Sequence, residues 1–88
     1  MVFFALSKSG VLEYERLLPH IDRLELWVGN SVLTQEEISA LRTTGAAVSV
    51  FTEQIHPADA QAVSHALDVI REHHLGETIW METSALEA

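Results

Sequence analysis

The residues best suited to chemistry stand in two short loops, of which the first is Ser7-Lys8-Ser9-Gly10. It places two hydroxyls and a cation directly before an expected helix, where backbone N–H groups can also bind an anion such as phosphate. The loop lacks the glycines at fixed spacing that define a P-loop or a dinucleotide-binding turn. A solvated turn with a capping serine is the simpler interpretation, and an anion site is the alternative.

The second loop carries Thr52, Glu53, Gln54 and His56. A carboxylate close to an imidazole can orient the ring for acid-base catalysis, and Glu53 and His56 are close enough in sequence to form such a pair. However, His56 stands directly before Pro57, a favoured first residue of a helix, which accounts for this region structurally. No Gly-x-Ser-x-Gly turn is present, so a hydrolase is not indicated. We predict no catalytic residue.

The five histidines raise the question of a metal site. His65, Asp68 and Glu72 recur at helical spacing, and His73 and His74 follow them. An exposed helix side normally carries such residues, and adjacent histidines point in different directions, so this spacing does not assemble a ligand shell. Imidazoles in the last turn of a helix are also stabilised by the helix dipole. We expect neither a metal nor a cofactor.

Composition restricts the class of protein further. Five Lys and Arg against thirteen Asp and Glu give a net charge of −8 over 88 residues, which repels nucleic acid. The absence of cysteine excludes disulfides and weakly favours a cytoplasmic location. The apolar run 2–6 is too short for a signal peptide, and no stretch is apolar enough to cross a membrane. With 48% hydrophobic and 20% charged residues, the chain is typical of a globular domain.

Four segments have the patterns of strands. The runs 2–6 and 46–51 are almost wholly apolar and predict strands buried on both faces. The segments 23–28 and 78–82 mix apolar and charged residues, which is typical of edge strands. We expect a single domain over residues 1–82, followed by a C-terminal tail at 83–88.

Three helices are predicted between these strands. Apolar spacing indicates a helix over 11–21, and Thr34 with Glu37 forms a capping box that starts a second helix before Gly45 ends it. The third and longest helix is expected over 57–75. Alternating strands and helices predict an α/β fold with an open, parallel four-stranded sheet.

With the apolar strands in the middle, the predicted order is 2-1-3-4, with right-handed crossovers. The pattern resembles a shortened flavodoxin-type sheet, a likeness of architecture that implies no activity. A split β-α-β sandwich is the competing topology and would need hairpins. In the predicted order one helix, the first, lies alone on one face, and the other two share the opposite face.

Such unequal coverage has a consequence for contacts. A single short helix cannot cover four strands, so apolar side chains of the third and fourth strands should remain bare on that face. A second copy of the chain, another protein or the tail with Leu86 would cover them. Trp27 and Trp80 stand on the two predicted edge strands and are candidate contact residues, since tryptophan is favoured in interfaces. Alternatively, both indoles close the rims of the core.

Ligands of open parallel sheets bind beyond the carboxyl ends of the strands, where the strand order reverses. In the predicted order this crevice lies between the first and third strands. The candidate ligand-binding residues are therefore those of the two loops above and of the neighbouring turn: Ser7, Lys8, Ser9, Gly10, Asn30, Ser31, Thr52, Glu53 and His56.

These observations favour a small acidic protein-interaction or regulatory module without catalytic activity, binding another protein or a second copy of itself. The alternative is a domain that binds an anion or a phosphate ligand with the loops after the first and third strands. Neither nucleic acid nor a membrane is an expected partner.

Overall fold

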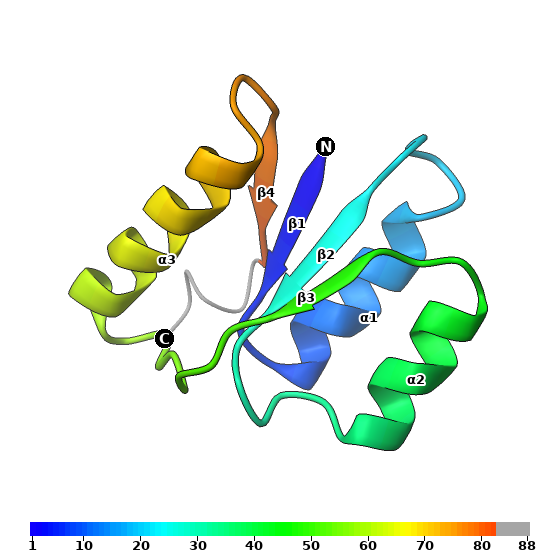
Figure 1. The fold of residues 1–88 in the computed structure, drawn as a ribbon, viewed down its shortest axis with the longest axis horizontal. Coiled ribbons are helices and arrows are strands. Elements are labelled where there is room, and N and C mark those ends of the chain that lie inside the picture. Colours follow the sequence, from blue (N-terminus) through cyan, green and yellow to red (C-terminus); the bar gives the residue numbers. More distant parts are fainter. Residues whose placement is uncertain (83–88) are drawn as a thin grey trace.

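The computed structural model describes residues 1–82 and has an α/β architecture, which confirms the predicted fold class (Figure 1). Residues 83–88, which include the predicted tail and Leu86, lie outside the described residues. The elements in chain order are β1 (Val2–Ala5), α1 (Lys8–Leu17), β2 (Glu25–Val28), α2 (Gln35–Thr43), β3 (Val48–Val50), α3 (Ala60–His73) and β4 (Ile79–Met81).

All strand pairs are parallel, in the order β3-β2-β1-β4. The predicted order 2-1-3-4 is therefore wrong, because β2 is central and β3 is an edge strand. In the observed register Phe3 of β1 lies between Leu26 of β2 and Trp80 of β4. Val48 of β3 pairs on the outer side of Leu26.

The error has a physical origin in the side chains of β2. Its alternating pattern suggests one covered face, yet Leu26, Trp27 and Val28 are all buried. Trp27 can be buried opposite its neighbours because its indole N–H donates to His74 Nε2 at 3.2 Å, which satisfies its polar atom. By contrast, the apolar segment around β3 supplies only three strand residues, and Val50 is exposed at the edge.

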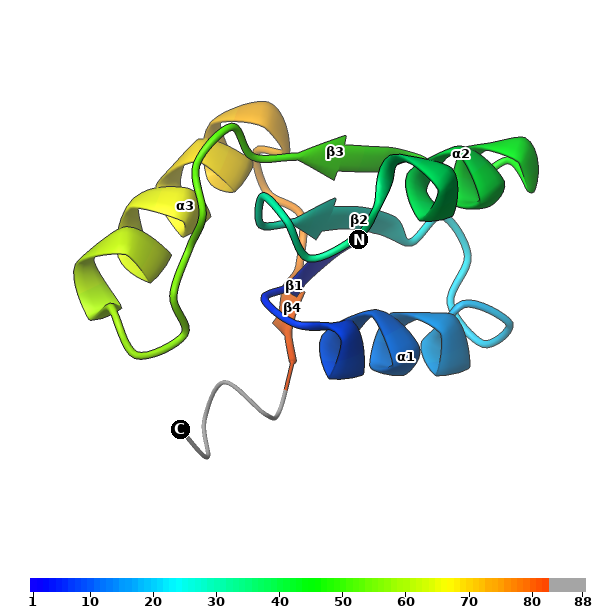
Figure 2. The ribbon, with the colours of Figure 1, turned by 90° about the horizontal axis from the view of Figure 1, so that it is seen from below.

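The strand order also decides which helix lies alone. The chain steps from β1 to β2 to β3 in one direction, so α1 and α2 lie on the same face, while the return to β4 puts α3 on the other (Figure 2). The prediction that the first helix stands alone is thus wrong, and α3 takes that position. Two core clusters result, one around Phe3 and Leu26 under α1 and α2, the other around Phe4 and Ile70 under α3.

Helix ends follow local capping. The Ser7 side chain accepts the Gly10 N–H, so α1 begins at Lys8, earlier than predicted. Asp59 caps α3 in the same way, which leaves Pro57 outside the helix. The predicted capping box of α2 is present in both directions, and the Thr34 backbone N–H, donating to Glu37, lowers the pKa of that carboxyl. None of the helices among residues 1–82 combines the length and apolar character needed to cross a membrane.

Tyr14 occupies the centre of the cluster beneath α1. Its side chain is fully buried, and its hydroxyl has no hydrogen-bond partner among residues 1–82. Burial raises the pKa of Tyr14 above its ordinary 10.0, and the nearby Glu15 carboxylate adds to the effect. The neutral phenol is therefore favoured in the folded state.

Replacing Tyr14 with phenylalanine is expected to raise the free energy of unfolding by about 1 kcal/mol, because an unpaired buried hydroxyl is removed. Since the folded-state pKa of Tyr14 is raised, ionisation of Tyr14 leaves the stability of the wild-type protein unchanged below pH 10.0 and lowers it as the pH rises above that value. The variant should lose less stability in alkali, and Tyr14 is the chain's one tyrosine. Urea unfolding at neutral pH and near pH ~11 measures both effects. Lower stability of the variant at neutral pH would contradict the account.

Candidate functional site

The carboxyl ends of β1, β2 and β3 surround one open pocket of about 390 Å³. We call it the loop pocket, and its lining residues are Leu6, Ser7, Lys8, Asn30, Ser31, Val32, Gln54, Ile55, His56 and Pro57. The structure therefore brings together five of the predicted ligand-binding residues, from three separate loops. Their convergence follows from parallel pairing, which puts all carboxyl ends at one edge.

The other candidate residues have different positions. Ser9 is exposed on α1 outside the loop pocket. Thr52 and Glu53 fix the neighbouring turn, because their carbonyl oxygens accept the side-chain and backbone N–H groups of Asn30 at 3.0 and 3.3 Å. Within the described residues, no hydrogen bond or ion pair joins the side chains of Glu53 and His56. The hypothetical acid-base pair is thus not assembled.

The start of α1 holds a carboxylate of the chain itself. Glu82, which follows β4, accepts hydrogen bonds from the Leu6 backbone N–H and, at 2.6 Å, from the Ser7 hydroxyl. Its side chain is only 1% exposed. The N-terminal end of a helix favours a negative group, so Glu82 takes the place that an external anion would have at the Ser7–Gly10 loop.

Glu82 is the site residue that sequence reasoning missed. The predicted crevice between the first and third strands is wrong, because β1 has β2 and β4 as neighbours. The strand order reverses between β1 and β4, and Glu82 fills that position. The sequence feature connected with this site is Gly10, because a Cβ at that position would approach the Glu82 Cδ to 2.7 Å. Gly10 is thus required by the close approach of a buried side chain.

Replacing Gly10 with alanine is expected to lower the free energy of unfolding by about 2 kcal/mol, because the added methyl group displaces Glu82. At an ordinary helix position the same change stabilises a protein by about 1 kcal/mol. Urea unfolding measures the difference, with Ser9→Ala at the exposed neighbouring position as the matched control. A Gly10→Ala protein more stable than wild type would contradict the close packing of Glu82 on α1.

The outer strand β4 presents the second candidate site. Trp80 is 44% exposed and pairs in register with Phe3, so it lies on the face that carries α1. A hollow of about 300 Å³ lies beside it, lined by Phe3, Glu13, Arg16, Leu17, Trp80 and Met81. We call Trp80, this hollow and the free side of β4 the β4 edge.

The exposed Trp80 therefore lies on the face that carries α1, as the prediction had it, but this face carries two helices and not the lone helix that was expected. On the face of the lone helix, Ile79 and Met81 of β4 pack against the α3 cluster. On the other face, α1 and α2 follow β1 and β2 and so cover β1, β2 and β3. Trp80 lies at the margin of that layer, beside α1.

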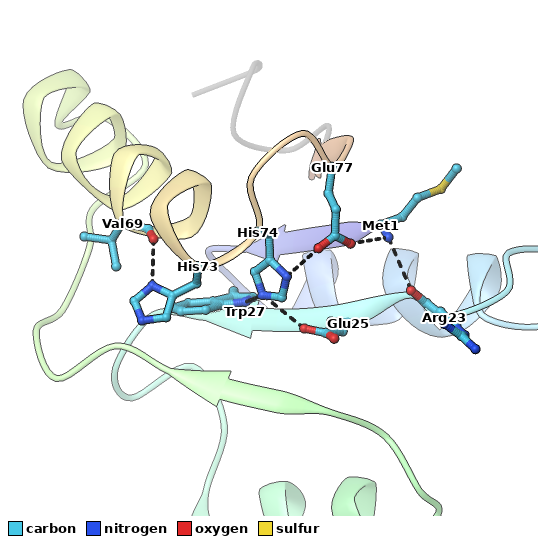
Figure 3. A network of polar contacts seen from close by, with 8 residues as sticks. All are labelled: Met1, Arg23, Glu25, Trp27, Val69, His73, His74 and Glu77. Carbon is cyan, nitrogen blue, oxygen red and sulfur yellow. Dashed lines mark hydrogen bonds and ion pairs between the residues drawn. The ribbon is translucent and has the colours of Figure 1, made fainter.

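The two tryptophans have different environments. Trp27 is 8% exposed and packs against Phe51, His73 and His74, so it belongs to the interior of the described chain. Its indole N–H reaches the His74 ring at 3.2 Å (Figure 3). Trp80 is thus the tryptophan accessible for a contact, and Leu86, the third candidate contact residue, lies outside the described residues.

Backbone groups of β4 point in two directions. The Thr78 carbonyl accepts from the Val2 N–H at 3.0 Å, and the Glu82 N–H donates to the Phe4 carbonyl at 3.3 Å. Because alternate residues of a strand turn their backbone groups to opposite sides, the N–H and C=O of Ile79 and Met81 face away from β1. Among residues 1–82 no strand pairs with that side.

Metal ligands are not gathered anywhere in the described part of the chain, where no three His, Asp or Glu side chains lie close enough to hold an ion. In the helix that carries His65 and Glu72, the Asp68 carboxylate pairs instead with Arg71 at 3.1 Å. Comparison with known protein families, curated proteins and solved structures found no match.

Proposed function

We propose that this chain is a small acidic protein-interaction module without catalytic activity, and that it self-associates through the β4 edge. The observation that carries the proposal is Trp80, exposed at the centre of an outer strand whose free side has no pairing partner among residues 1–82. An open strand edge is a template for pairing with another strand, and tryptophan is enriched in contact hot spots. The partner we propose is a second copy of the same chain.

The backbone of β4 supports a symmetric pairing. In an antiparallel arrangement centred on Trp80, Ile79 of one copy stands opposite Met81 of the other. Both residues turn their N–H and C=O groups outward, so they exchange hydrogen bonds in each direction. The two Trp80 residues then form the close, non-hydrogen-bonded pair on the same face, with Cβ atoms about 5 Å apart. The same patch serves both copies, as a twofold interface requires.

Side chains beside β4 support the same symmetry. In the joined sheet the α1 helices of the two copies flank the paired tryptophans, and the hollow next to each Trp80 provides room for the indole. The twofold axis reverses the direction of α1. Glu13 and Arg16 both border this hollow, so side chains of both charges lie beside the proposed interface.

Net charge provides a test of partner identity. Each copy carries a net charge of −8, so long-range repulsion opposes self-association, whereas the same negative charge would attract a basic protein. We expect the dimer to become tighter as sodium chloride is raised from about 0.05 to 0.5 M, because the Debye length shrinks to a few Å. Sedimentation velocity at each salt concentration measures this change. Association that weakens steadily with salt would count against a like-charged partner.

Light scattering coupled to size-exclusion chromatography tests the proposal itself. Over concentrations from about 1 µM to 1 mM, the mass should rise from the 9.8 kDa of one chain toward twice that value. A mass that stays at 9.8 kDa throughout would overturn self-association. Assemblies larger than a dimer would overturn the symmetric β4 pairing, which is closed by its twofold axis.

A second candidate function is the binding of a small anion in the loop pocket. The specific observation in its favour is that Lys8, Asn30, Ser31 and His56 line one pocket from separate loops. Two features weaken it: the Lys8 ammonium already lies 3.6 Å from Glu37, and Glu82 occupies the nearby helix start.

Titration with inorganic phosphate up to about 10 mM, followed by amide chemical shifts, tests this second function. Binding predicts saturable shifts at Lys8, Asn30 and His56 that Lys8→Ala abolishes and Arg71→Ala, at an exposed cation elsewhere, preserves. Absent shifts, or shifts unchanged in Lys8→Ala, would dispose of it.

A further inference from the structure

His74 lies where the end of α3 meets the amino ends of β1 and β2 (Figure 3). Its side chain is 14% exposed. Its Nδ1 is 2.8 Å from Glu77 Oε2. Its Nε2 faces two groups at once, the Trp27 indole nitrogen at 3.2 Å and Glu25 Oε2 at 3.0 Å.

The two partners of Nε2 require opposite proton positions. The Trp27 indole N–H can only donate, so its hydrogen bond needs a bare Nε2. The Glu25 carboxylate can only accept, so its hydrogen bond needs a proton on Nε2. A neutral ring protonated at Nδ1 bonds to Glu77 and Trp27, whereas an imidazolium bonds to Glu77 and Glu25.

We propose that His74 is a proton-dependent switch that exchanges its hydrogen bond with Trp27 for an ion pair with Glu25. Such an exchange needs a side chain that can both gain and lose a ring proton, and histidine is the side chain suited to this. The inference concerns the edge of the sheet opposite to the loop pocket and does not rest on pairing of β4.

The charged groups around His74 come from each neighbouring element. Glu25 belongs to β2, and Glu77 lies between α3 and β4, where its other oxygen accepts from the Met1 ammonium at 2.9 Å. The hydrogen bonds from that ammonium and from His74 lower the pKa of Glu77, which favours the ionised carboxylate as the acceptor for His74 Nδ1. His73 packs its ring against Trp27 and places Nδ1 2.9 Å from the Val69 carbonyl.

The exchange changes how the elements are joined. In the neutral state α3 is bonded to the buried core residue Trp27 of β2, whereas in the charged state it is bonded to Glu25 at the rim. Glu77 remains attached in both states and lies two residues before β4. Protonation therefore alters the contact between α3 and β2 while the start of β4 stays anchored.

Nuclear magnetic resonance of the Trp27 indole N–H tests the proposal, with Trp80→Phe leaving one indole in the chain. From about pH 8 to 5 the indole proton should move upfield as its acceptor is lost, together with the His74 ring nitrogen signals. Glu25→Gln should move this transition to lower pH, because the neutral amide forms no ion pair with the imidazolium. His74→Gln should abolish it, while His73→Gln, the matched control, should preserve it.

Three results would overturn the switch. An indole signal that stays constant while the His74 ring titrates would show that the hydrogen bond is not exchanged. A transition that persists in His74→Gln and disappears in His73→Gln would assign the effect to His73. A transition unchanged in Glu25→Gln would remove Glu25 as the competing partner. The ring signals of the otherwise intact Trp80→Phe chain keep the test valid even if His74→Gln unfolds.

Discussion

Replacing Glu82 with alanine is expected to lower the free energy of unfolding by about 3 kcal/mol, a large part of the stability of a domain this small. The change leaves the Leu6 N–H and the Ser7 hydroxyl buried without their acceptor. It also removes the negative group at the start of α1. Because Glu82 connects the end of β4 to α1, its loss should loosen the whole β4 side of the sheet.

Two further variants separate the loss of the buried hydrogen bonds from the general effect of removing a carboxylate. Glu82→Gln keeps the shape of the side chain and one accepting oxygen, so the free energy of unfolding should fall by only about 1 kcal/mol. Glu53→Ala removes a carboxylate from an exposed loop and should stay within about 0.5 kcal/mol of wild type. Urea unfolding of the three variants at neutral pH gives the comparison. If Glu82→Ala were as stable as Glu53→Ala, the buried position of Glu82 would be contradicted.

The second large effect is expected at the β4 edge. Trp80→Lys should weaken self-association about 1,000-fold, because a hot-spot residue contributes about 2 kcal/mol and the symmetric interface contains it twice. Two lysines would also face each other across the twofold axis, and a charge directed at a strand edge opposes pairing. Sedimentation equilibrium measures the dissociation constant. Stability of the monomer should change little, since Trp80 is 44% exposed.

Leu75→Lys is the matched control for this prediction. Leu75 is 84% exposed and lies outside β4, and its replacement changes the net charge by the same amount. It should leave the dissociation constant within a few-fold of wild type. Equal weakening by both variants would mean that the effect does not depend on the position of the lysine, and the β4 edge would lose its assigned role.

Local sequence patterns predict much of this fold. Alternating strands and helices lead to the parallel α/β class, and Thr34 with Glu37 correctly predicts the start of α2. The strand order fails because it depends on which strand faces are covered, a long-range property. The alternating pattern around Trp27 predicts that its side chain lies on a poorly covered face. The indole can be buried because the His74 ring, 47 positions away, accepts its N–H.

The candidate site, like the fold, can be predicted only in part from the sequence. The loops that carry Lys8, Asn30 and His56 converge because parallel strands align their carboxyl ends, a rule that holds for any strand order. Glu82 could not be found by this rule, since its contact with Ser7 requires β4 beside β1. A glycine in the first turn of a helix, Gly10, marks that contact only once the neighbouring strand is known.

Amide hydrogen exchange in β4 tests the proposed pairing most directly. At concentrations that favour the dimer, the Ile79 and Met81 N–H groups should be protected, and dilution to the monomer should remove that protection. The Trp80 N–H, which faces β1, should change much less. Equal exchange of Ile79 and Met81 in dimer and monomer would show that the chains do not pair through this strand.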